Sequence, residues 1–442
     1  MASRSSLITR PIVAAQEALM RLLKAEAFGG LLLLACTLVA LFCVNSSIGE
    51  AYASWWLKPI HLGLGDWSLT KDIQLFVNDG LMTLFFFVVG LEIKKECTSG
   101  ELQRLRSAAL PAISALGGMI IPALFYRLAV PEGPGARGWG IPMATDIAFV
   151  VGLLSLLGDR VPKGLKVWLL TLAIVDDIGA VLVIAVFYTQ GLAYVPLALA
   201  GAGFVAIFAA EKAGVRSTGI YTLLGFAIWF AVLKSGVHPT IAGVLLGLMT
   251  PAKALYPDHK SSLKGLREAL RIFETQKSKA SAALEKVSEV ALESLAPLER
   301  LAHSLEPWNR YLVLPLFALA NAGVVLSAAD GAQDIRNGVL LGLLIGKPLG
   351  VLGLSYLAVR LNVAELPRGV SWKVLAAASL LTGVGFTMSI FIAGLALDSS
   401  LLGQGKIGTL EASAISASLG LLGLLLVLPK QKPKPTVVLF KR

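Results

Sequence analysis

Asp176 and Asp177 stand side by side in LTLAIVDDIGAVLVIAVF, a run with no other charge. A charged group at the centre of the bilayer costs about 3 kcal/mol on insertion scales. It therefore needs an oppositely charged partner, a water-filled cavity or a functional role. Adjacent helical residues point about 100° apart, so both carboxyl groups can flank one cavity at a helix crossing. Such a pair can be protonated in one state and ionised in another, as proton-coupled transport requires. The alternative is a bonded pair between spans without transport.

Thr145 and Asp146 lie early in a second apolar segment, GIPMATDIAFVVGLLSLLGDR, behind Gly140 and Pro142. The glycine and proline predict a helix that is interrupted near the bilayer centre. Backbone ends exposed there are tolerated where they line a cavity, and their partial charges can meet ions. Asp146 would then balance positive helix ends or position a cation pathway, or serve with Thr145 as an ordinary N-cap.

Lys347 lies deep in a third run, LLGLLIGKPLGVLGL, directly before Pro348. A buried ammonium demands an acid, and the sequence offers Asp176 or Asp177. A fourth run, LLTGVGFTMSIFIAGLAL, is broken by Gly383, Gly385 and Thr387. It resembles the Thr145 segment as a second broken helix, although glycines at such positions also serve close helix packing.

The elements that must position these residues are membrane spans. The chain has 442 residues, 56% of them hydrophobic and 15% charged, and a mean hydropathy of +0.75. These values lie outside ordinary soluble domains. Since a span needs about 20 apolar residues, we predict an all-α polytopic membrane protein with about twelve helices. The expected spans are 28–48, 74–94, 107–130, 142–158, 164–188, 192–211, 217–234, 236–253, 309–328, 336–359, 371–397 and 408–429.

The net charge of +11 is explained by membrane orientation and not by nucleic acid, because the basic residues lie in alternate loops between apolar runs. This distribution places both termini in the cytoplasm. The residues of the inner loops are Lys94, Lys95, Arg104 and Arg106, then Arg160, Lys163 and Lys166, then Lys212 and Arg216, then Arg360 and Arg368.

The predicted organisation has five parts. They are a cytoplasmic N-terminal segment (1–25), spans one to eight (26–254), a cytoplasmic amphipathic loop (255–308), spans nine to twelve (309–430) and a basic cytoplasmic tail (431–442). The mixed charges of the long loop predict an amphipathic helix or pair of helices that serves as a solvated or membrane-surface linker, with a regulatory role as the alternative. The outer loop from Gly49 to Lys71 carries Trp55, Trp56 and Trp67, which favour the headgroup region.

Several of these runs match a known family. The stretches VNDGLMTLFFFVVGLEIKKE, ATDIAF, IVDDIGA, LKSGVHPT, PLFALANAG, IGKPLG and GVGFTMSIFIAGLA follow one another from about Val77 to Leu397. In them the sequence resembles the NhaA-type sodium/proton antiporters, which are themselves an example of inverted-repeat transporters. The resemblance implies twelve helices in a bacterial inner membrane, two inverted repeats, two crossing interrupted helices and alternating access.

The resemblance also assigns roles. It implies a sodium and proton site at Asp176 and Asp177, with Thr145 and Asp146 at the first interrupted helix and Lys347 facing the acids. It further implies electrogenic exchange of Na⁺ or Li⁺ for H⁺, in sodium and pH homeostasis, by a homodimer assembled partly through the outer loop. No resident cofactor is expected, and the transported ions are the only metal.

Three further positions match the family. Asp79 and Glu92 correspond to the dimer-side helix and the cytoplasmic funnel, and His238 lies in SGVHPT. A lone histidine beside a proline is more often a packing or capping residue than a titrating one. The sequence departs from the family at Ala302, where an acid is expected, and at Glu306, where a histidine is common. The pH set-point is therefore not carried over.

Other functions fit less well. A sodium-coupled symporter of an organic anion needs further buried cations, and few occur besides Lys347. An intramembrane aspartyl protease needs its two acids on different spans, and a pump needs a nucleotide-binding motif. A passive channel does not need buried acids with broken helices in both halves. We therefore expect a transporter and not an enzyme.

Overall fold

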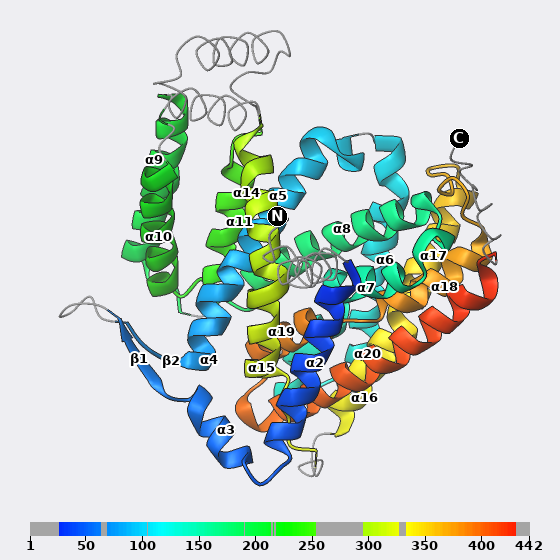
Figure 1. Ribbon diagram of the computed structural model, residues 1–442, viewed down its shortest axis with the longest axis horizontal. Helices are drawn as coiled ribbons and strands as arrows, with labels where there is room; N and C mark the ends of the chain where they lie inside the picture. The colour runs from blue at the N-terminus through cyan, green and yellow to red at the C-terminus, as the bar shows by residue number, and fades with distance from the viewer. Residues whose placement is uncertain are drawn as a thin grey trace, which may run out of the picture.

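The apolar runs form long helices in the computed structural model (Figure 1). The structure describes residues 26–62, 69–103, 105–189, 191–213, 215, 218–252, 295–326 and 333–429. Within these ranges, seven helices are long and apolar enough to cross a membrane, or nine if each of two bent helix pairs is one span. The predicted N-terminal segment, the basic tail and most of the long loop lie outside the described residues.

The first half of the chain contains the hairpin and the first broken span. Its helices are α2 (Glu26–Val44), α3 (Gly49–Trp56), α4 (Ile73–Phe76), α5 (Met82–Ser99), α6 (Leu105–Ala129), α7 (Ile147–Leu156), α8 (Lys163–Phe187), α9 (Tyr194–Lys212), α10 (Thr218–Ser235) and α11 (Pro239–Met249). A π-helical turn, Val77–Leu81, joins α4 to α5. Short 3₁₀ segments cover Glu101–Gln103, Pro134–Met143 and Gly158–Arg160.

The second half contains the lysine-bearing span and the second broken span. Its helices are α14 (Pro297–Trp308), α15 (Leu314–Asn321), α16 (Gln333–Leu341), α17 (Lys347–Arg360), α18 (Trp372–Thr382), α19 (Phe386–Ala396) and α20 (Ser399–Val427). Two π-helical turns, Asn309–Val313 and Gly342–Gly346, make α14–α15 and α16–α17 continuous.

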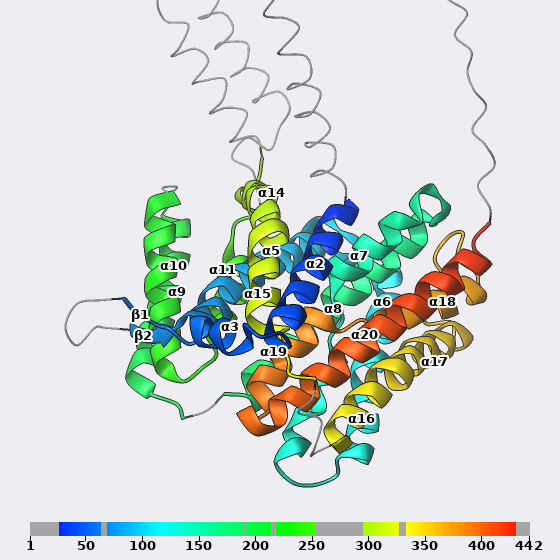
Figure 2. The ribbon, with the colours of Figure 1, turned by 60° about the horizontal axis from the view of Figure 1, so that its bottom comes forward.

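The loop between α3 and α4 corrects the all-α expectation in one place. After α3, strands β1 (Pro59–Leu62) and β2 (Leu69–Asp72) pair antiparallel, with Ile60 opposite Lys71. In Figures 1 and 2 this hairpin projects from the helices toward α9 and α10. Trp55 is 48% exposed but Trp56 is buried, and Trp67 lies outside the described residues.

The helices pack in two groups. One large apolar core joins α2, α5–α8 and α15–α20, whereas a smaller core links α9, α10 and α11. Both ribbon views show α9 and α10 standing beside the main bundle (Figures 1 and 2). Close approaches depend on glycine: a Cβ at Gly117 of α6 would lie 2.1 Å from the carbonyl oxygen of Gly350 in α17. Small residues of this kind let membrane helices approach closely.

Most predicted spans overlap an observed helix, with two departures. The span predicted at 236–253 contains the shorter helix Pro239–Met249. The span predicted to begin at 309 lies in a helix that already begins at Pro297, because Pro307 does not end it. The π-helical turn that follows Pro307 widens the helix at this point. The predicted boundary at residues 308 and 309 therefore falls inside continuous helix.

Candidate ion-binding site

Two interrupted spans cross at the centre of the bundle. The chain is extended at Ala144 and Asp146, between the 3₁₀ segment and α7. In the other half, α18 and α19 are bent by 44° at Gly383–Gly385. The Asp146 N–H donates to the carbonyl oxygen of Val384 at 2.7 Å, so the two breaks bind each other. The interruptions predicted at both segments are present.

The glycines of the second break are needed for close packing. A Cβ at Gly383 would lie 2.4 Å from the carbonyl oxygen of Leu343 and 2.4 Å from Ser416 Oγ. A carbonyl oxygen in a helix cannot move aside cheaply. Close packing and interruption, the two alternatives for these glycines, therefore occur together.

Gly383→Ala is accordingly expected to cost about 1–3 kcal/mol through overpacking. Gly394→Ala in α19 is the matched control, because a Cβ there meets nothing within 4 Å. Thermal unfolding of the two purified variants measures the difference. Equal melting temperatures for both would show that the break tolerates a side chain.

Asp176 is fully buried in α8 and faces both the first break and α17. Its Oδ2 accepts from Thr145 Oγ at 2.7 Å and lies 2.9 Å from Lys347 Nζ. Thr145 Oγ also lies 3.2 Å from the carbonyl oxygen of Thr382, next to the second break. Of the two acids predicted for Lys347, the structure selects Asp176.

Lys347 is positioned by an unusual turn. The π-helical turn Gly342–Gly346 directly precedes it, and Pro348 lacks the N–H of a regular helix. A wider turn accommodates a proline ring that would clash with the carbonyl of a regular turn. Lys347 also donates to the carbonyl oxygen of Met143, the last residue before the first break. One ammonium thus binds both a carboxylate and an open helix end.

Asp177 is 2% exposed, and its Oδ1 has no hydrogen-bond partner in the described part of the chain. The Oδ1 of Asp176 is also without a partner there. Asp177 directly follows Asp176 in α8. Buried polar atoms are nearly always satisfied, so carboxylate oxygens without partners on two consecutive residues indicate a place for a cation or a proton.

Asp146 binds two helix N-termini. Its Oδ1 accepts from the Phe149 N–H at 3.0 Å as the N-cap of α7. Its Oδ2 accepts from the N–H of Thr387 at 3.1 Å, in the first turn of α19, and from the Thr387 hydroxyl. Two of the alternatives predicted for Asp146, a cap and a counter-charge for helix ends, therefore describe it.

A cavity of about 80 Å³ lies beside the breaks. Its lining includes Thr145 and Thr382 beside the two breaks, and also Ser155 and Lys166. Lys166 belongs to the first turn of α8, next to the basic loop of Arg160 and Lys163. The cavity therefore runs from the crossing toward the basic end of α8.

The remaining predicted residues lie apart from the crossing. Glu92 is half-buried in α5, near the ion pair of Glu306 and Arg310. Asp79 and His238 belong to a different polar cluster with Lys71 of the hairpin. The imidazole of His238 accepts from the Thr240 N–H as the N-cap of α11, which is the capping alternative. The structure thus groups Asp176, Asp177, Thr145, Asp146, Lys347 and Thr387, with Gly383 at the break.

Sequence reasoning missed the groups that satisfy the broken backbone. Ser389 donates to the carbonyl oxygen of Ile141 at 2.7 Å, and Ser413 accepts from the Phe386 N–H at 3.1 Å. The carbonyl oxygen of Met143 was also missed. Pro142 signals an open backbone end near Met143, but nothing in the sequence identifies which distant side chain binds it.

Comparison with known proteins finds relatives that align over most of the chain. An Na(+)/H(+) antiporter NhaA 2 of Sorangium cellulosum is 45% identical over 412 residues, which is 91% of this chain and 88% of the relative. An Na(+)/H(+) antiporter NhaA of Rhodopirellula baltica is 45% identical over 415 residues, 93% of this chain and 94% of the relative. Another, of Rhizobium meliloti, is 42% identical over 428 residues, 96% of this chain and 98% of the relative.

The sequence profile of the family described as Na+/H+ antiporter 1 matches residues 20–424, nearly the whole chain. With the apolar helices described above, this match identifies a multi-pass membrane protein. The chain belongs to the Na+/H+ antiporter 1 family.

Proposed function

We propose that this protein is a secondary transporter that exchanges Na⁺, or Li⁺, for H⁺ across a bacterial inner membrane. The observation that carries the proposal is the pair of open carboxylate oxygens, Oδ1 of Asp176 and Oδ1 of Asp177, buried where two broken helices cross. Hard cations favour such oxygen ligands, and protons compete for the same atoms. Relatives named as Na⁺/H⁺ antiporters support the choice of ions.

The cycle follows from competition. Na⁺ entering the cavity binds the ionised carboxylates of Asp176 and Asp177, and the protons that it displaces leave by the same route. Thr145 and the carbonyl oxygen of Thr382 lie beside Asp176 and supply further oxygens. Lys347 is the basic side chain paired with this site among the described residues, and it neutralises Asp176 when no cation is bound.

Exchange of two protons for each Na⁺ moves net charge. The membrane potential then drives transport with about 2.3 kcal/mol per charge for each 100 mV. The second proton comes from the other acid or from Lys347. Alternating access presents the site to each side in turn, and we assign the conformation seen here as inward-facing, an assignment that the Lys166-lined cavity supports.

The wider architecture is part of the proposal. We infer twelve spans in two inverted repeats with both termini in the cytoplasm, which puts the basic end of α8 inside and the hairpin outside. The two broken spans, one in each half, support the repeat. We further infer a homodimer in which the hairpin takes part, and a role in sodium and pH homeostasis.

The test is Na⁺-dependent dequenching of a pH-sensitive dye in everted membrane vesicles between pH 6 and 9. Native vesicles are expected to move protons when Na⁺ is added, and Asp176→Asn and Asp177→Asn are each expected to reduce the signal to background. Asp334→Asn is the matched control, because this exposed carboxyl group in the first turn of α16 lies outside the site.

Native vesicles that move no protons at any pH, although the protein is folded, would refute antiport. If transport persists in both site variants, the site assignment fails while antiport stands. Equal loss in Asp334→Asn would show that the substitutions act through general damage.

A further inference from the structure

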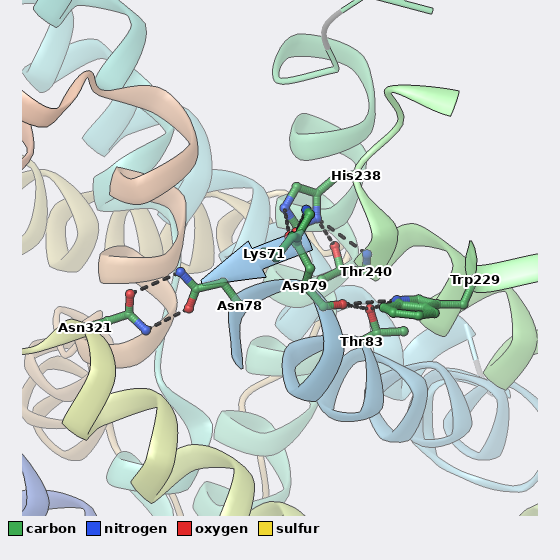
Figure 3. Close-up of polar contacts among 8 residues, drawn as sticks. All are labelled: Lys71, Asn78, Asp79, Thr83, Trp229, His238, Thr240 and Asn321. Atoms are coloured by element: carbon green, nitrogen blue, oxygen red, sulfur yellow. Dashed lines mark hydrogen bonds and ion pairs between the residues drawn. The ribbon is translucent and has the colours of Figure 1, made fainter. Parts of the chain in front are cut away.

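A second polar cluster, outside the ion site, joins the hairpin to the helices beside it (Figure 3). Lys71 of β2 forms an ion pair with Asp79, in the π-helical turn between α4 and α5. Asp79 is only 8% exposed, so its charge is largely removed from water. Loss of its ammonium partner would leave an uncompensated buried charge, which is strongly unfavourable. The pair therefore fixes the hairpin to this span.

The same turn is bound from the opposite direction by α10. The Trp229 indole N–H donates to the main-chain carbonyl oxygen of Asp79 and to Thr83 Oγ, both at 3.1 Å. The Thr83 hydroxyl also donates to the Asp79 carbonyl oxygen at 2.5 Å. Both side chains therefore bind the Asp79 carbonyl oxygen within the π-helical turn. Asp79 is thus the junction of hairpin, span and α10.

His238 extends this junction to the start of α11. Its Nδ1 lies 2.7 Å from Thr240 Oγ and accepts from the Thr240 N–H at 3.4 Å. When Nδ1 accepts this bond, the proton of a neutral imidazole is on Nε2. Nε2 lies 3.8 Å from Asp79 Oδ1 and faces it (Figure 3). The ring is therefore oriented from one side by Thr240 and from the other by Asp79.

The far edge of the His238 ring meets Phe391 of α19. The two ring centroids are 5.4 Å apart with planes at 84°, an edge-to-face contact. Phe391 is 3% exposed and is also enclosed by Phe86 and Phe317, at 5.5 and 6.1 Å between centroids. It lies one helical turn beyond Thr387, which binds Asp146 at the crossing. The cluster thus touches the half-helix that belongs to the ion site.

We propose that Lys71, Asp79 and His238 form a latch that holds α19 in the position seen here and so sets the balance between inward-facing and outward-facing conformations. This inference rests on the proposed function. In this structure the cavity lies toward Lys166, whereas Phe391 is tightly packed on the other side of the break. Release of the latch favours the opposite conformation. Lys71 is then a positioning residue that acts on transport without touching the ion.

The latch predicts changes of opposite sign at the two membrane faces. Lys71→Met should shift the population toward the outward-facing state, which lowers the KM for Na⁺ at the outer face and raises it at the inner face. A shift of about fivefold in each direction lies within the usual range of coupling between sites. The measurement is the KM for Na⁺ in right-side-out and inside-out vesicles prepared from the same cells.

Three matched variants define the outcome. Lys58→Met removes the same charge from an exposed position beside β1 and should match the native protein. Lys71→Arg, which keeps the charge, and the exchange Lys71→Asp with Asp79→Lys should move both KM values back toward native. A merely structural defect lowers the maximal rate at both faces and is not rescued by the exchange.

The latch is refuted if native vesicles transport Na⁺ but Lys71→Met has the same KM for Na⁺ as Lys58→Met at both faces. It is also refuted if Lys71→Met shifts the KM in the same direction at both faces. If native vesicles do not exchange Na⁺ for H⁺, the proposed function fails instead. The two failures are therefore distinguishable in one set of vesicles.

Discussion

Lys347→Met is expected to destabilise the protein by about 3–5 kcal/mol, the usual cost of leaving one member of a buried ion pair without its partner. Asp176 and Lys347 are both fully buried, and their charged atoms lie 2.9 Å apart. Asp176→Asn alone should cost a similar amount, because it leaves the ammonium unpaired. The double variant Lys347→Met with Asp176→Asn should recover most of the loss, since neither buried charge remains.

Thermal unfolding of the four purified proteins measures this cycle. The double variant should lose less stability than the sum of the losses of the two single variants, because the two groups are in direct contact. If the double variant is as unstable as the sum of the single variants, the pair is not what holds α17 against α8. The cycle concerns stability alone, and transport should be absent in every variant that lacks Asp176.

Asp146→Asn is expected to lower the rate of transport by at least about tenfold, because a hydrogen bond to a charged group contributes about 1.5–3 kcal/mol and Asp146 satisfies two helix ends. The amide keeps one acceptor oxygen but turns an NH₂ group toward either Phe149 N–H or Thr387 N–H. One N-terminus is then left without its cap, and the breaks that hold Thr145 against Asp176 move apart.

Thr387→Val is the graded control for that prediction. It removes the hydroxyl that donates to Asp146 but keeps the main-chain N–H bond at 3.1 Å. Initial rates of Na⁺-driven proton movement should fall in the order native, Thr387→Val, Asp146→Asn. A rate for Asp146→Asn equal to that of the native protein would show that the carboxylate is not needed at the crossing.

The residues of the candidate site could be predicted because charged residues are rare inside apolar membrane spans. Asp176, Asp177 and Lys347 stood out since a buried charge in an apolar run needs a partner or a task. The breaks were predicted because Gly140, Pro142, Gly383 and Gly385 interrupt otherwise regular runs. These arguments use local sequence alone, and the structure places the residues at one crossing.

Pairings between distant spans could not be predicted in the same way. Lys347 pairs with Asp176 and not with Asp177 because of the rotation of α17 and its position against α8. The rotation and the position both depend on tertiary packing. The second helix end bound by Asp146 belongs to Thr387, which is 241 positions away. The sequence contains no signal for that contact, because a helix N-terminus of any span would serve.

The hairpin and the start of α14 were missed for local reasons. The loop from Gly49 to Lys71 was interpreted from its tryptophans. Tryptophans indicate a position at the headgroup region of the membrane, but they do not indicate whether strands pair. Pro307 resembled a helix boundary, but it lies inside a helix that runs on through the π-helical turn Asn309–Val313. Asp79 and His238 were noted one at a time, whereas their contact with Lys71 and Phe391 follows from the fold.

Proton release on Na⁺ binding tests the central claim most directly. Purified native protein in detergent, in weakly buffered solution near neutral pH with a pH indicator, should acidify the solution when NaCl is added but not when choline chloride is added. Asp176→Asn and Asp177→Asn should release none, and Asp334→Asn should equal native. Na⁺ binding without proton release, or full release by both site variants, would contradict competition of Na⁺ and H⁺ for these two carboxyl groups.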